Sequence, residues 1–118
     1  MEKITINELT HKVIGAAIEV NRELGPGLLE SVYEYCLESE LKAQGINVQR
    51  QVSLPVIYKN KELGKRFFID LLVDDQLVIE LKCAEATLPL HKVQLLTYLR
   101  LSKHKLGLLI NFNVPKLT

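Results

Sequence analysis

Three charged residues stand inside apolar, strand-like runs, and their types and spacing suggest chemistry. Asp70 interrupts the run Phe67–Val73, and Glu80 and Lys82 interrupt the run Leu77–Cys83. Side chains alternate between the two faces of a strand, so Glu80 and Lys82 point to the same side. A buried charge is costly unless it is paired with an opposite charge or bound to a metal. These three side chains therefore require partners.

Two explanations account for these charges. The first is an internal ion pair between Lys82 and either Glu80 or Asp70. The second is a metal site, in which the two carboxylates bind a hard cation such as Mg²⁺ and the cation contacts phosphate. In such a site Lys82 would hold the attacking water or stabilise the phosphate charge. The residue pattern alone leaves both explanations open.

The loop between the two runs decides whether the carboxylates can meet. A two-residue turn at Asp74–Asp75 would place Asp70 opposite Ile79, whereas a three-residue loop over 74–76 would place Asp70 opposite Glu80. A shift of one residue moves a side chain to the other face of the sheet. Asp–Asp is a poorer two-residue hairpin turn than Asn–Gly or Asp–Gly. We therefore predict the three-residue loop.

Hydrophobic periodicity predicts the elements that position these residues. Helices are expected over about 7–24, 28–45 and 90–102, and strands over about 48–58, 67–73, 77–83 and 106–112. The order is helix, helix, strand, strand, strand, helix, strand. This order predicts an α/β domain with a mixed sheet and helices packed on it.

Several local expectations accompany this scheme. Asn7 is a suitable N-cap for the first helix. Alternation in the first strand predicts one apolar face made of Val48, Val52, Leu54, Val56 and Tyr58. Pro55 in that strand indicates an edge position or a bulge, because proline lacks a hydrogen-bond donor. The continuous apolar run 106–112 predicts a buried strand, parallel to a neighbour.

Composition limits the class of protein. The chain has 118 residues, 47% of them hydrophobic, and a net charge of +1, which fits one globular domain over residues 1–118. It contains no apolar run of transmembrane length and no signal-peptide pattern, so we expect a cytoplasmic location. Cys36 and Cys83 are too few for a disulfide framework or a zinc site, and we expect buried, inert thiols.

The order of these motifs resembles a known superfamily. Asp70, then Glu80-x-Lys82, then a helix and an apolar strand, is similar to the core of the PD-(D/E)XK nuclease superfamily, although Ile69 stands where that superfamily often has proline. Gln94–Tyr98 is similar to the Gln-x-x-x-Tyr element of RecB-type exonuclease domains. Gly27–Tyr33 matches the motif that names the GxxExxY family. The resemblance covers nearly the whole chain and implies a restriction-endonuclease-like core.

The resemblance also implies site residues. It implies a Mg²⁺ or Mn²⁺ site with Asp70 and Glu80 as the main ligands and the Leu81 carbonyl as a further one, while Glu30 would face the metal directly or through water. Lys82 would be the catalytic lysine, Gln94 would orient the site or contact substrate, and Tyr98 would support it. Without the resemblance, Glu30 is a favourable acid in a first helical turn, and Tyr33 beside it is a core residue.

Two functions follow from this resemblance. The first is a metal-dependent nuclease that hydrolyses phosphodiester bonds in nucleic acid, DNA more readily than RNA. The second is a catalytically silent module with the nuclease fold, which binds nucleic acid or serves in assembly. The small size of the chain favours the module or a larger protein partner, and its apolar composition suits a homodimer.

Overall fold

The computed structural model describes residues 4–117 and contains the predicted order of elements. The helices are α1 (Ile6–Leu24), α2 (Glu30–Ala43) and α3 (Pro89–Ser102). The strands are β1 (Val48–Tyr58), β2 (Lys61–Val73), β3 (Leu77–Lys82) and β4 (Leu106–Asn111). None of the helices within residues 4–117 has both the length and the apolar character needed to cross a membrane.

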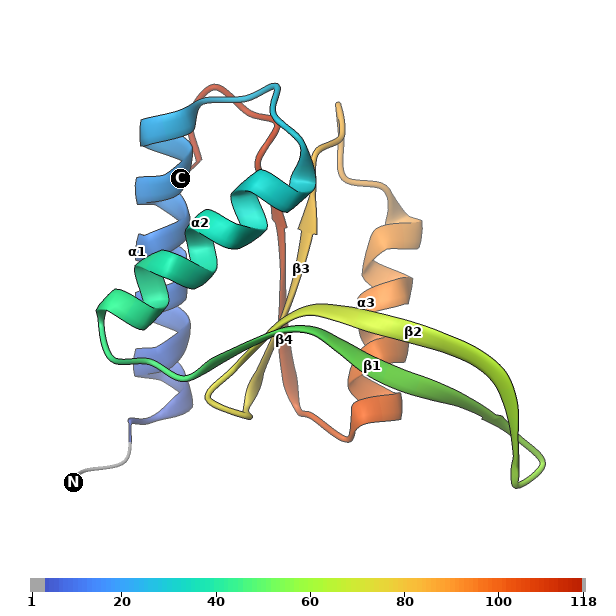
Figure 1. Ribbon diagram of the computed structural model, residues 1–118. Coiled ribbons are helices and arrows are strands. Elements are labelled where there is room, and N and C mark those ends of the chain that lie inside the picture. Colours follow the sequence, from blue (N-terminus) through green and yellow to red (C-terminus); the bar gives the residue numbers. More distant parts are fainter. Residues whose placement is uncertain (1–3, 118) are drawn as a thin grey trace.

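The four strands form one mixed sheet in the order β1-β2-β3-β4. The strand pairs β1–β2 and β2–β3 are antiparallel, and β4 is parallel to β3, as predicted. Figure 1 shows α1 and α2 on one side of β3 and β4, with α3 on the other side. The predicted α/β class, with helices on both sides of a mixed sheet, is confirmed.

The turn between β2 and β3 has the predicted length. Val73 pairs with Leu77 and Leu71 pairs with Ile79, which leaves a three-residue loop over 74–76. Asp74 and its neighbour adopt left-handed backbone conformations, with φ of 51° and 53°. The paired register ends at Leu71 and Ile79, and Asp70 and Glu80 are the next residues along the two strands, one on each strand of the hairpin.

Two hydrophobic clusters hold the layers together. The larger one joins α1 and α2 to one face of the sheet; among its members are Leu9, Val13, Tyr33, Leu37, Leu71, Ile79 and Phe112. The smaller one joins α3 to the other face and consists of the buried residues Leu54, Ile69, Leu72, Val78 and Leu95. The carboxylates lie on strands that are shared by both clusters.

The C-terminal segment is fastened to α1 by one buried amide. Asn21 Nδ2 donates to the carbonyl oxygens of Phe112 and Val114, at 3.3 and 3.0 Å. Its Oδ1 accepts from the N–H of Leu117 at 2.9 Å. These bonds satisfy a polar side chain that would be costly to bury alone.

The prediction of one apolar face along β1 is wrong. Val48 packs in the larger cluster, whereas Leu54 and Val52 pack in the smaller one. Gln51 between them has a φ of 54°, and the strand register omits it. This left-handed residue breaks the alternation of side chains. Before it, the apolar side chains of β1 pack toward α1 and α2, and after it they pack toward α3. Tyr58, farther along, is 58% exposed.

The expectation for Pro55 is confirmed, because β1 is an edge strand and its register shifts between Pro55 and Ile57. The second strand is longer than predicted and starts at Lys61 instead of Phe67. Its additional residues pair with β1 but are exposed, so the hydrophobic pattern did not mark them.

Smaller expectations also need correction. Thr5, not Asn7, caps α1: its Oγ1 accepts from the N–H of Glu8 at 3.2 Å. The last strand is parallel to β3 as expected, but it is an edge strand and mostly half-buried. Cys36 and Cys83 are also half-buried instead of fully buried.

Candidate active site

The hairpin of β2 and β3 brings two carboxylates together. The N–H of Leu81 donates to Asp70 Oδ2 at 2.8 Å, and the N–H of Asp70 donates to Glu80 Oε1 at 3.3 Å. Glu80 is only 5% exposed, and Asp70 is half-buried. Neighbouring strands therefore hold both carboxyl groups through backbone hydrogen bonds.

This environment disfavours two negative charges. Burial, together with the charge of Asp70, raises the pKa of Glu80 to about 8. Burial also raises the pKa of Asp70, although its bonds from the Leu81 N–H and Gln51 oppose that shift. Like charges in a desolvated place favour protonation unless a cation compensates them. The pair is therefore a suitable place for a cation.

Lys82 makes no ion pair with this carboxylate pair. The salt bridges found within residues 4–117 all involve other side chains. Lys82 is nevertheless close enough for its charge to lower the pKa of both Asp70 and Glu80. The internal ion pair considered from the sequence is not formed, and the lysine stands beside the carboxylates as a separate cation.

A turn fixed by Tyr33 places Glu30 at the start of α2. The Tyr33 hydroxyl donates to the carbonyl oxygen of Gly25 and accepts from the N–H of Leu28. Its ring is fully buried and stacks on Phe112 at a centroid distance of 4.8 Å. Tyr33 thus has the packing role expected for it, and its hydroxyl also fixes the turn that precedes Glu30.

The remaining predicted residues are Glu30, Tyr98 and Gln94, and the first two interact electrostatically with the pair. The charge of Glu30 contributes to the raised pKa of Glu80, so the first-helix acid faces this region. Burial raises the pKa of Tyr98, and the charges of Glu80 and Asp70 add to the effect. Gln94 is half-buried on the same helix, and no hydrogen bond joins it to the carboxylates within residues 4–117.

Two further residues belong to this cluster and were missed by sequence reasoning. Gln51 Nε2 donates to Glu34 Oε1 at 2.7 Å and to Asp70 Oδ1 at 3.3 Å. Glu34 is 6% exposed, and burial raises its pKa. The only sequence signal was its spacing, since Glu34 lies four residues after Glu30 on the same helix face. Gln51 thus connects α2 to the carboxylate pair.

Asn111 fixes the chain as it leaves β3. Its Oδ1 accepts from the N–H of Ala84 at 3.2 Å, and its Nδ2 donates to the carbonyl oxygen of Ala84 at 2.9 Å. The N–H of Phe112 donates to the carbonyl oxygen of Lys82 at 2.9 Å. The end of β4 therefore holds the backbone around Lys82 in place.

The donor set suits magnesium better than a metal ion that protein side chains enclose on all sides. Within residues 4–117, no three His, Cys, Asp or Glu side chains are arranged to enclose a metal ion. Mg²⁺ commonly uses one or two carboxylates and completes its shell with water and substrate phosphates. The pair formed by Asp70 and Glu80 meets that requirement.

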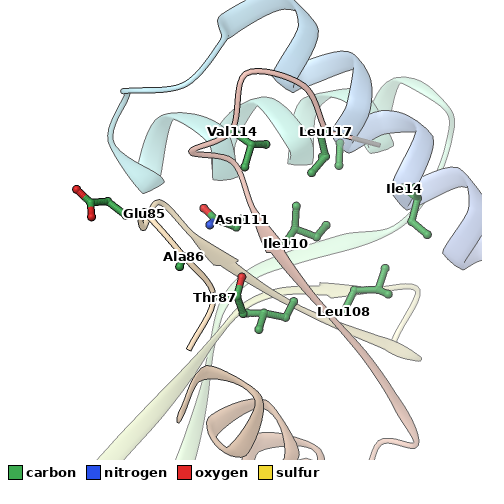
Figure 2. A pocket seen from close by; sticks show the side chains of 11 residues that line it. Ile14, Glu85, Ala86, Thr87, Leu108, Ile110, Asn111, Val114 and Leu117 are labelled. Carbon is green, nitrogen blue, oxygen red and sulfur yellow. The ribbon is translucent and has the colours of Figure 1, made fainter. Parts of the chain in front are cut away.

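A separate cavity of about 470 Å³ lies beside β4 and does not include the carboxylate pair. Figure 2 shows Ile14 of α1, Leu108 and Ile110 of β4, and Val114 and Leu117 of the C-terminal segment around it. Its lining is mainly apolar. Asp70, Glu80 and Lys82 do not line this cavity, so the candidate active site at the β2–β3 hairpin is separate from it.

A mixed sheet between helices, with paired carboxylates and a lysine on adjacent strands, defines a restriction-endonuclease-like protein. Residues 7–118 match the family model of the PD-(D/E)XK nuclease superfamily, and the chain belongs to this superfamily. Comparisons with curated proteins and with solved structures found no match. Membership supports a nuclease-like function on nucleic acid, in a superfamily whose members generally use divalent metals.

Proposed function

We propose that this protein is a metal-dependent nuclease that hydrolyses phosphodiester bonds of nucleic acid. The observation that carries the proposal is the contact between Asp70 and Glu80, with Lys82 beside them and not bound to either. A structural ion pair would have neutralised the lysine. A nuclease needs the carboxylates for a cation and the lysine for substrate or water.

The roles of the residues follow from their positions. Asp70, Glu80 and the Leu81 carbonyl would hold Mg²⁺ or Mn²⁺, which activates water and neutralises phosphate charge when bound. Glu30 would contact the metal through water, because it is exposed at the start of α2. Lys82 would stabilise the charge that develops on the scissile phosphate.

Finer assignments extend this proposal. Tyr98 would support the site, and Gln94, one turn before it on α3, would contact substrate. The motif Gly27–Tyr33 supports placement in the GxxExxY family, because its tyrosine fixes the turn before its glutamate. We favour DNA over RNA as substrate, and we include a homodimer as the simplest protein assembly.

A cleavage assay tests the function directly. Wild-type protein is incubated with Mg²⁺ or Mn²⁺ and single- or double-stranded DNA and RNA, beside Asp70→Asn, Glu80→Gln and the matched control Glu23→Gln on α1. We expect cleavage that falls about 100-fold or more in the first two variants and is unchanged in the control. Cleavage that survives in both variants contradicts the proposal.

The silent-module alternative gives a different result. That alternative predicts nucleic-acid binding without cleavage under every metal condition. Calorimetric titration with Mg²⁺ adds a second readout, since Asp70→Asn should abolish the binding isotherm and Glu23→Gln should retain it. Size-exclusion chromatography of the wild type tests the homodimer.

A further inference from the structure

The outer half of the β1–β2 hairpin, residues 57–68, extends away from the helices, and we refer to it as the arm. Figure 1 shows it continuing beyond the body of the sheet. Its side chains are exposed, including large apolar ones that folding would normally bury: Ile57, Tyr58, Leu63, Phe67 and Phe68. Clustered exposed apolar side chains commonly mark a binding surface.

The arm is also basic. It contains four basic residues and one acidic residue, a net charge of +3, whereas the whole chain carries only +1. Arg66 bonds to the one acid, Glu62, at 2.8 Å. Lys59, Lys61 and Lys65 make no salt bridge within the described residues 4–117. A polyanion is therefore the complementary partner.

Aromatic residues flank these cations along the hairpin, with Tyr58 before Lys59 and Phe67 and Phe68 after Arg66. Tyr58 is 58% exposed and Phe68 is 48% exposed, so each ring offers a surface to a planar ligand. A basic surface with exposed aromatic rings binds phosphates through its cations and stacks bases on its rings. Bases in a duplex are already stacked on their neighbours, so this combination favours unpaired strands.

The arm leads to the carboxylate pair along β2. Phe68 lies on β2 two residues before Asp70. Phe67 contacts Tyr98 of α3, with ring centroids 5.5 Å apart. From Lys61 to Asp70 the strand covers roughly 30 Å, at about 3.3 Å per residue. One bound strand can therefore reach from the arm to the carboxylates.

We propose that the arm binds single-stranded nucleic acid, with phosphates on Lys59, Lys61 and Lys65 and bases stacked on Tyr58 and Phe68. This inference rests on the proposed nuclease function for what happens at Asp70, but binding to the arm needs neither metal nor cleavage. It names the unpaired strand as the substrate class.

Binding is measured by fluorescence anisotropy with a labelled single strand of about 15 nucleotides, in EDTA. The protein is the full chain carrying Asp70→Asn, so that the probe stays intact. The charge test replaces the three arm lysines with glutamine. Its matched control replaces three exposed lysines elsewhere, Lys12, Lys105 and Lys116, and therefore removes the same net charge.

The stacking test uses single substitutions in the same background. Phe68→Ala removes a ring, and Phe68→Tyr retains it. Tyr35→Ala is the matched control, because Tyr35 is an exposed aromatic residue on α2, outside the arm. Circular dichroism checks that every variant is folded.

We expect the arm lysine triple to weaken binding at least 10-fold and to lower the salt dependence by about two in log–log slope. Phe68→Ala should weaken binding about five- to 100-fold at unchanged salt slope, and Phe68→Tyr should restore it. The lysine and Tyr35 controls should stay within about twofold of the parent protein.

Three results would overturn the proposal. Equal weakening by the two lysine triples would show that only net charge matters. Tighter binding of a duplex of the same length would assign the surface to paired nucleic acid. Self-association that disappears with Phe68→Ala, without loss of strand binding, would make the arm an interface between two copies.

The outcome is separable from that of the cleavage assay. If the arm variants bind like the parent while wild-type cleavage depends on Asp70, only the arm proposal fails. If strand binding depends on the arm but no metal supports cleavage, the arm proposal stands and the nuclease function fails.

Discussion

The two faces of the sheet are built differently. On one face, α1 and α2 contribute many buried apolar residues to the larger cluster, among them the fully buried Leu9, Leu37 and Leu41. On the other face, Leu95 is the only buried residue that α3 contributes to the smaller cluster. The first face provides most of the apolar burial that stabilises the fold. The second leaves room for polar groups.

Glu80 and Lys82 lie where this second face is incomplete, whereas Gln51 connects Asp70 to Glu34 of α2, on the first face. Glu80 follows Val78 of the smaller cluster by two residues, and Lys82 follows Glu80 by two. One side of β3 therefore begins with a packed apolar residue, Val78, and continues with two charged residues, Glu80 and Lys82. We therefore expect stability to depend mainly on the face covered by α1 and α2, and activity to depend on the charged residues, and the following variants test that expectation.

Lys82→Met should give the largest effect on activity. Cleavage should fall about 100-fold or more, because the lysine stands beside the site without a structural partner. The free energy of unfolding should change by less than about 1 kcal/mol, since no buried ion pair is broken. Cleavage assays and denaturant unfolding of one preparation measure both. A loss of about 3–5 kcal/mol would instead indicate a structural ion pair.

Leucine truncations compare the faces directly. Leu37→Ala, in the larger cluster, should cost about 3–4 kcal/mol of unfolding free energy, because it leaves a cavity among fully buried neighbours. Leu95→Ala should cost about 2 kcal/mol, because the smaller cluster borders solvent and can relax. Urea unfolding gives both values. Equal losses would mean that α3 is as tightly packed as α1 and α2.

The pH dependence of stability should follow Glu80. Its pKa is raised to about 8 in the folded protein, from an ordinary value of 4.5, so the folded state retains a proton that the unfolded state loses. The unfolding free energy should therefore fall as pH rises from 4.5 to 8, by up to about 5 kcal/mol without metal. Glu80→Gln should flatten this fall, whereas Glu23→Gln should not.

Gln51 should give the smallest effect and the most specific one. Gln51→Ala and Gln51→Gly both remove the amide that holds Asp70, so each should weaken Mg²⁺ binding about three- to tenfold. The glycine variant should be more stable than the alanine variant by about 1 kcal/mol, because φ is 54° at this position. Calorimetry measures the first effect and thermal unfolding the second. Unchanged metal affinity in both variants would limit Gln51 to a backbone role.

The sequence predicted the features that depend on neighbouring residues and missed those that depend on residues distant in the chain. The register of the hairpin followed from the poor turn propensity of Asp74–Asp75, and element order followed from hydrophobic periodicity. Glu34 was missed because its burial depends on Gln51, which is 17 residues away in the chain. The change of layer along β1 was missed because glutamine has no preference that predicts a left-handed backbone.

The loop over 74–76 contributes no side chain to the carboxylate pair, yet it fixes which residues meet there. A change in the turn that shifted the partner of Val73 from Leu77 to Gln76 would bring Ile79, not Glu80, opposite Asp70. Among descendants of this protein, substitutions in the loop should be tolerated and insertions or deletions should not. Natural selection can therefore act on the length of this loop as strictly as on the identity of an acidic side chain.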